Sequence, residues 1–317
     1  MGEFELISQF FSRPSHRAVL GVGDDCALLQ PAAGMQLAIS TDMLVCGQHF
    51  FADVDPYTLG HKALAVNLSD LAACGARPLA FTLALALPES NETWLKAFSE
   101  GLFALAEQHD CELIGGDTTR GPLTISITVL GEVPPGQALL RSGARIGDDI
   151  YVSGTLGDAR LALDALQSKI ELSASHLSQA RVRLEQPSPR VALGLALRGI
   201  ANSAIDVSDG LLGDLQHILD ASHVGATLYA QALNDAMMIK GYPLHYVMAG
   251  GDDYELVFTA PPGKRDAVTN AAHYAATPVT RFGTIDAALQ VRLLDAQGTL
   301  LTGQFASFDH FPNANIS

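Results

Sequence analysis

Acidic residues in this sequence cluster beside glycine, serine or threonine, directly after short apolar runs. Six such groups occur: Gly23-Asp24-Asp25, Ser40-Thr41-Asp42, Ser69-Asp70, Gly116-Asp117-Thr118, Asp206-Val207-Ser208-Asp209-Gly210 and Gly250-Gly251-Asp252-Asp253. Small neighbours allow a ligand to approach the backbone closely. Carboxylate and hydroxyl oxygens are the hard ligands that Mg²⁺ prefers. The pattern therefore indicates a site that holds magnesium ions.

Each group also has an ordinary structural interpretation. Asp-Gly pairs mark turns, and an aspartate before a helix is commonly its N-cap, which would explain Asp209. Asp70 differs because it lies within a helical pattern rich in alanine and leucine. An unpaired buried aspartate is costly, so it needs a partner, either a metal ion or a nearby arginine or lysine.

The chemistry that such carboxylates could support depends on cations. If the carboxylates converged without them, mutual repulsion would raise their pKa values. The sequence contains neither the phosphate-binding pattern G-x-x-x-x-G-K-[ST] nor the kinase motifs H-R-D and D-F-G. A phosphoryl-transfer enzyme built from these residues would rely on metal ions more than on lysines.

The elements that must position these residues can be read from the apolar patterns. We predict a strand over 36–42 that presents Ser-Thr-Asp at its end, and a helix from Pro56 to about Gly75 that carries Asp70. A strand over 111–115 is expected to lead into a turn at 115–117. A strand over 204–207 is expected before a helix that starts at Asp209. Strands and helices alternate in both halves, which predicts mixed α/β domains.

Length and composition limit the classes of protein. The 317 residues and the Pro134-Pro135-Gly136 linker predict two domains, 1–136 and 137–317. With 19 basic against 34 acidic residues, the net charge of −15 argues against binding to nucleic acid or to an anionic membrane. The apolar run 79–87 is too short to span a bilayer. The four cysteines show no C-x-x-C spacing, and the first residues show no signal-peptide pattern, so we expect a cytoplasmic protein with reduced thiols.

The order of the motifs is more specific than any one of them. Together they closely resemble the thiamine-monophosphate kinase family, which belongs to the aminoimidazole ribonucleotide synthetase superfamily. The resemblance runs from about Glu3 to Phe311 and is carried by 21–29, 40–42, 67–76, 115–118, 205–210 and 250–256. It implies a two-domain α/β (α+β) fold with mixed sheets covered by helices. It also implies ATP as co-substrate, several Mg²⁺ ions, thiamine diphosphate as product, and a homodimer formed through the N-terminal domains. K⁺ is a further candidate cofactor.

The resemblance also implies roles for individual residues. The positions that match magnesium ligands are Asp25, Ser40, Thr41, Asp42, Asp70, Asp117, Asp206 and Asp209. The positions that match ATP contacts are Gly116, Asp117, Arg141 and Ser208. The positions that match thiamine-side contacts are His49, Asp252 and Phe308. The family usually has glutamate in place of Asp252, and often tyrosine or tryptophan in place of Phe308. Taken alone, His49 also fits an ordinary half-buried histidine, and Asp252 fits a loop turn. Phe308 also fits a core aromatic residue, and Arg141 fits a solvated charge.

The implied reaction is phosphoryl transfer from ATP to the phosphate of thiamine monophosphate. A phosphate monoester with a second pKa near ~6 is mostly dianionic at neutral pH, so no strong general base is needed. Magnesium ions held by Asp42, Asp70 and Asp117, the expected catalytic residues, would neutralise the two anions and align them for in-line attack without a phospho-enzyme.

Two alternatives follow from the same residues. The first is another substrate on the same scaffold, as in the relatives that make aminoimidazole ribonucleotide or selenophosphate, or that mature hydrogenases. A reactive cysteine expected for selenophosphate synthesis does not precede Cys26, and the residues 313–317 hold no cysteine of the hydrogenase-maturation kind. The second is a nucleotide- or metal-binding regulatory protein without activity, which the complete carboxylate set disfavours because clustered charges are costly.

Overall fold

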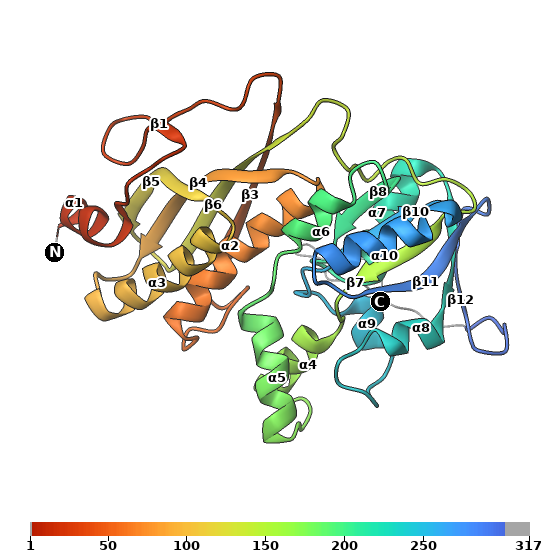
Figure 1. Cartoon of the computed structure of the whole chain (residues 1–317). Helices are drawn as coiled ribbons and strands as arrows, with labels where there is room; N and C mark the ends of the chain where they lie inside the picture. Colours follow the sequence, from red (N-terminus) through yellow and green to blue (C-terminus); the bar gives the residue numbers. More distant parts are fainter. Residues whose placement is uncertain (1, 302–317) are drawn as a thin grey trace, which may run out of the picture. The chain divides into compact units, whose positions relative to one another are not determined.

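The computed structural model (Figure 1) describes residues 2–301 of the chain. The chain divides into two compact units between Ala138 and Leu139, two residues after the predicted boundary. We call them the N-terminal unit and the C-terminal unit and describe each by itself. Phe308, an expected thiamine-side residue, lies outside the described residues.

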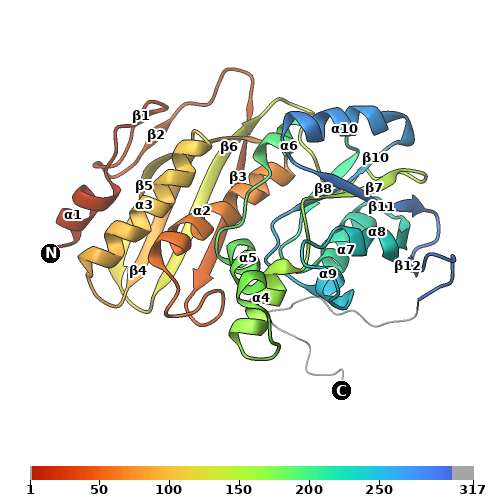
Figure 2. The ribbon, with the colours of Figure 1, turned by 60° about the horizontal axis from the view of Figure 1, so that its bottom comes forward.

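The N-terminal unit is a four-stranded sheet with two long helices on one face. The strands follow the order β3 (Gln36–Val45), β6 (Thr124–Val133), β4 (Arg77–Leu87) and β5 (Glu112–Arg120). β4 and β5 run parallel, and the other neighbours are antiparallel. The helices α2 (Pro56–Ala73) and α3 (Glu92–Gln108) cover one face of the sheet (Figures 1 and 2). Shorter elements precede the sheet: α1 (Glu3–Leu6), η1 (Ile7–Phe11), β1 (Ala18–Leu20) and β2 (Leu28–Leu29).

The predicted helix from Pro56 is confirmed, and local chemistry explains where it begins. Asp55 is its N-cap and accepts hydrogen bonds from the backbone N–H groups of Tyr57 and Thr58, at 2.8 and 3.2 Å, while Pro56 occupies the first turn. Glycine lets this helix approach α3 closely. A Cβ atom at Gly60 would lie 2.0 Å from the carbonyl oxygen of Phe98.

Two strands extend further than the sequence predicted, and this changes the setting of two motifs. β3 stays paired with β6 as far as Val45, so Ser40-Thr41-Asp42 lies within the strand rather than at its end. β5 stays paired with β4 as far as Arg120, so the turn predicted at 115–117 is wrong. The strand passes this glycine pair because Gly116, at φ +151°, has no side chain: its Cβ would lie 1.9 Å from the carbonyl oxygen of Leu83.

The C-terminal unit is built on a six-stranded sheet. The strands follow the order β12 (Val291–Leu294), β9 (Gly225–Tyr229), β11 (Val279–Asp286), β7 (Asp149–Ser153), β10 (Leu256–Ala260) and β8 (Ser203–Asp206). Only β12 and β9 are parallel among these described pairs. The helices are α4 (Asp158–Leu166), α5 (Ala174–Glu185), α6 (Val191–Ala196), α7 (Leu211–Ser222), α8 (Ala230–Asp235), α9 (His245–Ala249) and α10 (Arg265–Tyr274), with the short η2 (Pro262–Lys264) before the last of them.

Helices cover both faces of this sheet. In Figures 1 and 2, α6 and α10 lie on one side and α7, α8 and α9 on the other. Alternation along β7 follows this division: Ile150 and Val152 join the core cluster that includes α7, whereas Tyr151 stacks on Phe258 with ring centroids 5.2 Å apart. The mixed α/β class predicted from the sequence is confirmed. Within the described residues, no helix has the length and apolar character needed to cross a membrane.

Candidate functional site

In the N-terminal unit, a hydroxyl group and a carboxylate meet between β3 and α2. The Ser40 hydroxyl donates a hydrogen bond of 2.5 Å to Oδ2 of Asp70, which is half-buried on α2. The sequence suggested a metal ion or a basic side chain as the partner of Asp70. A serine hydroxyl from a strand thirty residues earlier is one of its partners in the structure.

Asp42 lies on the same face of β3 as Ser40, because side chains two residues apart in a strand share a face. Its backbone N–H donates to Oδ1 of Asn67 at 3.0 Å, and Nδ2 of Asn67 donates to the carbonyl oxygen of Ala63 at 3.0 Å. Asn67 therefore fixes β3 against α2 beside Asp70. Asn67 belongs to the motif 67–76, but the sequence pattern alone does not indicate this role.

Three other predicted residues of this unit lie elsewhere on it. The Thr41 hydroxyl lies 2.8 Å from that of Thr128, on the sheet face opposite Ser40. Asp25 is exposed between β1 and β2. His49 lies in the turn that follows β3, where its Nδ1 accepts the backbone N–H of Val45 at 3.0 Å. That hydrogen bond fixes the imidazole ring and places any ring proton of the neutral form on Nε2.

Asp117 lies at the opposite edge of the same sheet. Asp42 pairs with Ile127, Ile127 with Leu83, and Leu83 with Gly116, the neighbour of Asp117. Three strand spacings of about 4.8 Å each, or roughly 14 Å in total, therefore separate Asp42 on β3 from the neighbourhood of Asp117 on β5. Ligands lie about 2.1 Å from a Mg²⁺ ion. Within one chain, Asp42 and Asp117 therefore cannot bind the same ion.

In the C-terminal unit, three of the predicted residues lie at the end of β8 and on the loop that follows it. Asp206 ends this strand and is 7% exposed, Ser208 is half-buried and Asp209 is exposed. The helix α7 begins at Leu211, two residues later than predicted, and its N-cap is Gly210. The interpretation of Asp209 as a helix N-cap is therefore wrong.

A carboxylate that sequence reasoning missed organises this loop. Oδ2 of Asp214, on the first turn of α7, accepts the backbone N–H groups of Ser208, Asp209 and Gly210 at 3.1, 3.1 and 3.2 Å. Asp214 is 3% exposed. Its burial, with the neighbouring Asp209 charge, raises the pKa of Asp214 to about 6 against the opposing effect of the three hydrogen bonds.

The segment 250–254 lies beside this loop. The backbone N–H of Asp252 donates to the carbonyl oxygen of Ser208, and that of Tyr254 donates to Val207, both at 2.8 Å. Asp252 adopts φ +66°, in the left-handed region. A Cβ at Gly251 would lie 2.5 Å from the Ser208 carbonyl oxygen, so only glycine permits this contact. Two motifs that are forty residues apart in the sequence thus meet.

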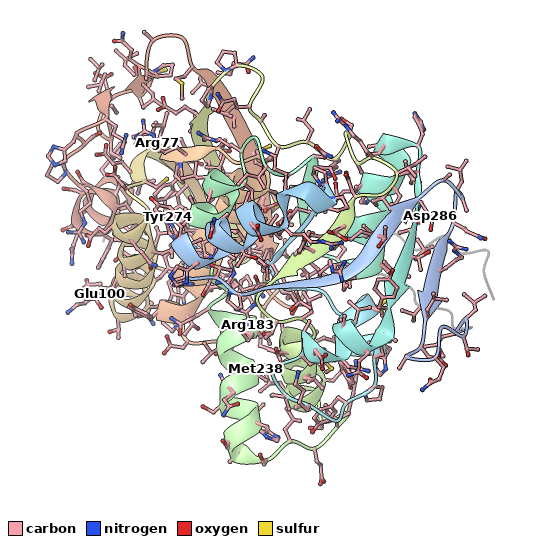
Figure 3. All side chains as sticks on the ribbon, turned by 45° about the vertical axis from the view of Figure 1, so that its right-hand side comes forward. Arg77, Glu100, Arg183, Met238, Tyr274 and Asp286 are labelled. Carbon is pink, nitrogen blue, oxygen red and sulfur yellow. The ribbon has the colours of Figure 1, made fainter. Side chains whose placement is uncertain are left out.

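Buried carboxylates hold the far side of this segment. Asp253 accepts the backbone N–H of Gly157 at 3.0 Å, and burial raises the pKa of Asp253 well above its ordinary value. Glu255 is fully buried and accepts from Ser153 at 2.5 Å, from Arg183 at 2.6 Å, and from Arg190. Arg183, on α5, is labelled in Figure 3. Both acids belong to the motif 250–256. Sequence spacing does not reveal the partners of Glu255, because those partners lie 65 to 102 residues before it in the chain.

The structure does not place the Arg141 backbone near Ser208. The Ser222 hydroxyl donates a hydrogen bond to the carbonyl oxygen of Arg141 at 3.3 Å. The Oγ atom of Ser222 also accepts the backbone N–H groups of Gly143 and Ala144, each at 3.1 Å. Ser222 ends the 12-residue helix α7, whereas Ser208 precedes its first turn. At 1.5 Å per residue, about 17 Å of helix separates the two ends.

The carboxylates do not form a complete metal cage on their own. In the part of the chain that the structure describes, no group of three or more His, Cys, Asp or Glu side chains has the arrangement of a metal site. Each unit instead supplies a small set of hard oxygen donors: Ser40, Asp42 and Asp70 in one, and Asp206, Ser208 and Asp209 in the other.

Comparison with known proteins gives the same family for the whole chain. The family models "AIR synthase related protein, N-terminal domain" and "AIR synthase related protein, C-terminal domain" match residues 23–133 and 145–294. A thiamine-monophosphate kinase of Salmonella typhimurium is 48% identical over 98% of both chains. The crystal structure of thiamine-monophosphate kinase from Stenotrophomonas maltophilia matches with a TM-score of 0.81 and 45% identity, over 92% of this chain and 94% of that one.

A second solved structure, AaThiL complexed with AMPPCP and TMP, matches with a TM-score of 0.75 and 28% identity over 89% of each chain. On the family models and on relatives this similar over the full length, the chain belongs to the thiamine-monophosphate kinase family of AIR synthase related proteins.

Proposed function

We propose that this kinase transfers the γ-phosphate of ATP directly to the phosphate of thiamine monophosphate, with Mg²⁺ ions, to give thiamine diphosphate. Membership of the kinase family supports the substrates and the overall reaction. The observation that carries the chemistry is the set of oxygen donors formed by Ser40, Asp42 and Asp70 between β3 and α2. Such oxygen donors suit Mg²⁺ and do not suit metal ions that prefer thiolate or imidazole ligands.

The donor set of both units fits magnesium. Asp42 and Asp70 with Ser40 would hold ions in the N-terminal unit, and Asp206 with Asp209 in the C-terminal unit; Asp25, Thr41 and Asp117 are the further candidate ligands. When bound, the ions neutralise the phosphate oxygens of both substrates. The loop amides of 208–210 already donate to Asp214, so this loop contacts a nucleotide through the Ser208 hydroxyl or through metal rather than through these N–H groups.

The protein's own groups bind and orient rather than exchange protons. The acceptor phosphate, with a second pKa near ~6, is already mostly dianionic at neutral pH and needs no general base. Gly116 and Asp117 on β5 and Arg141 are the proposed ATP contacts. The guanidinium of Arg141 offers a fixed fork of donors suited to phosphate. Bringing the reacting oxygens into line is then the main contribution of the site.

His49, Asp252 and Phe308 are the proposed contacts to the thiamine moiety. With Nδ1 of His49 engaged by Val45, its Nε2 is the nitrogen that a substrate would meet. Asp252 is one methylene shorter than the glutamate usual in the family, and its Oδ1 already accepts a hydrogen bond from the Tyr254 hydroxyl at 3.4 Å. We therefore propose that Asp252 reaches the substrate through a water molecule.

The uncovered face of the N-terminal sheet supports the proposal of a homodimer. Leu37, Ile39 and Met43 of β3 are 43%, 60% and 55% exposed on the face away from α2. Exposed apolar rows of this kind mark interaction surfaces. Pairing β3 of one copy with β5 of another would also bring Asp42 and Asp117 of different copies onto neighbouring strands. Sedimentation of Ile39→Asp should show a monomer; a dimer of unchanged strength would contradict this interface.

We further propose a cytoplasmic location and no nucleic-acid or membrane partner. The four cysteines, all within the described residues, form no disulfide, as expected in a reducing compartment. The net charge of −15 repels polyanions. K⁺ is a candidate for the cation that accompanies Mg²⁺, and turnover in K⁺ against tetramethylammonium salts tests it.

The deciding experiment incubates the purified protein with ATP, Mg²⁺ and thiamine monophosphate and separates the products by chromatography. We expect thiamine diphosphate and ADP in equal amounts, with no label retained on the protein from γ-labelled ATP. A labelled covalent adduct during turnover would contradict direct transfer. Binding of AMPPCP without any product would favour the regulatory-protein alternative.

A further inference from the structure

We propose that Asp214 is the positioning residue of the nucleotide- and metal-binding site of the C-terminal unit. It would act by holding the loop 206–210 in the conformation that presents Asp206 and Asp209 to cations. This inference rests on the proposed function for its kinetic consequences, but its geometric basis is independent of it. The sequence motifs did not predict Asp214 as a ligand-binding residue.

The geometry around Asp214 is more specific than a helix cap. In a capping box, an acidic side chain at the third helical position accepts one N–H, that of the N-cap residue. Asp214 is the fourth residue of α7, and its Oδ2 accepts three consecutive N–H groups, from Ser208 to Gly210. The loop is therefore wrapped around a single carboxylate oxygen.

Consecutive backbone N–H groups that converge on one point form a concave site for an anion, and many proteins use such a site for phosphate. Here a side chain of the same chain occupies it, and that side chain is 3% exposed. The loop consequently has no N–H from 208–210 left for a nucleotide phosphate. Its remaining ligands are oxygen atoms, which suits a loop that binds cations.

The loop 206–210 also fixes the position of Asp252. The Ser208 carbonyl oxygen accepts the backbone N–H of Asp252 at 2.8 Å, and Gly251 packs directly against it. Movement of residue 208 would displace Asp252 as well. One buried carboxylate thus fixes both the proposed metal loop and a proposed substrate contact.

The test compares Asp214→Ala, which leaves three N–H groups without an acceptor, with Asp214→Asn, which keeps one acceptor oxygen. Asp220→Asn is the matched control: it is an exposed carboxylate on the same helix, and its Oδ1 accepts a hydrogen bond from Nε2 of Gln216 at 2.7 Å. Each protein is assayed for kcat and for the KM of ATP and of thiamine monophosphate at varied Mg²⁺. Mn²⁺ binding with AMPPCP is measured by electron paramagnetic resonance, and amide hydrogen exchange is followed over 207–210.

We expect Asp214→Ala to weaken Mn²⁺ binding by about 10- to 100-fold, as residues that orient metal ligands commonly do. Hydrogen exchange over 207–210 should accelerate, and the Mg²⁺ needed for half-maximal turnover should rise. Asp214→Asn should lie between Asp214→Ala and the native protein, and Asp220→Asn should match the native protein. If Asp214→Ala does not fold, Asp214→Asn decides.

Unchanged Mn²⁺ affinity and unchanged exchange in a folded Asp214 variant would overturn the proposal. So would a loss of thermal stability with no change in the Mg²⁺ dependence, because that is the result of a purely structural role. The proposed function fails separately. If the native protein makes no thiamine diphosphate, the Mn²⁺ and exchange measurements still decide the role of Asp214.

Discussion

In the N-terminal unit Asp42, Asp70 and Asp117 belong to strands and a helix, whereas in the C-terminal unit Asp209 and Asp252 lie in loops. Ser40 and Asp42 are on β3 and Asp70 is on α2, so strand pairing and helix packing set their positions. The loops 206–210 and 250–254 are fixed by hydrogen bonds to each other, and the first loop also donates to the buried Asp214. Asp253, within the second loop, accepts from Gly157, and the adjacent Glu255 accepts from Arg183. The two units thus place similar side chains by different means.

This difference has a consequence for mutation. In the N-terminal unit, the strands and helices keep their pairing when a carboxylate is neutralised, so a substitution there should change chemistry while the fold persists. In the C-terminal unit, the acids behind the loops are buried, and their removal leaves donors without partners. Substitutions there should change stability and site geometry together.

The largest effect is expected from Asp42→Asn. This variant keeps the shape of the side chain and the backbone hydrogen bond to Asn67, but it removes the charge that would bind Mg²⁺. We expect turnover to fall at least about 10³-fold, the upper range for loss of one electrostatic group in a site, with the unfolding temperature almost unchanged. Asp53→Asn, an exposed acid in the segment before α2, is the control. Near-normal turnover in Asp42→Asn would remove Asp42 from the metal site.

The next effect is expected from Glu255→Ala in the other unit. Arg183 and Arg190, 12% and 17% exposed, would lose their shared carboxylate. Breaking one side of a buried ion pair typically costs about 3–5 kcal/mol. We expect urea unfolding to show that loss, with turnover reduced as well because the 250–254 segment loosens. Glu171→Ala, an exposed acid before α5, should leave both unchanged. If Glu255→Ala lost turnover but kept its stability, substitutions in the C-terminal unit would change chemistry alone, contrary to the contrast drawn between the units.

The sequence predicted the elements of both units well, because apolar periodicity and helix signals are local. The helix from Pro56 and the strand predicted over 204–207 come from such patterns. The end of β3 was misplaced because Ser40-Thr41-Asp42 is a polar stretch that continues in a strand only through its pairing with β6. Pairing between distant segments leaves no local signal.

For the candidate site, the sequence indicates residue types but not the residues that support them. Carboxylates beside small residues indicated cation chemistry, and the order of motifs indicated the family. Asp214 was not predicted, because an acid on the first turn of a helix is common and its three donors are known only from the folded loop. The separation of Asp42 from Asp117 was likewise invisible, since the strand order β3-β6-β4-β5 is a property of the tertiary fold.

A moderate effect on stability is expected from Gly116→Ala. Its Cβ would lie 1.9 Å from the Leu83 carbonyl oxygen, at a backbone φ of +151° that other residues rarely adopt. We expect a loss of about 1–3 kcal/mol, the usual cost of overpacking. Gly115→Ala is a closely matched control, because its Cβ would meet only the Thr82 Cγ2 atom, at 4.0 Å. Equal unfolding midpoints for the two variants would show that β5 shifts freely, contrary to a site fixed by strand pairing.

The smallest effect is expected from Asp149→Asn, an acid of the C-terminal sheet that supports neither loop. Burial would raise its pKa, but hydrogen bonds from Arg265 and Arg281 outweigh burial, so the pKa of Asp149 lies below its ordinary value. A carboxylate with a lowered folded-state pKa adds stability above its unfolded value of about 3.9, and that stability is lost as the pH falls below it.

Both arginines are about half exposed, so the contribution of Asp149 at pH 7 should be about 1 kcal/mol or less. We expect Asp149→Asn to be slightly less stable than the native protein at pH 7 and to converge with it near the acid end of a urea-unfolding series, with turnover unchanged. If turnover fell with stability, acids far from the loops would also support the site. The contrast between buried loop supports and the rest of the C-terminal unit would then be wrong.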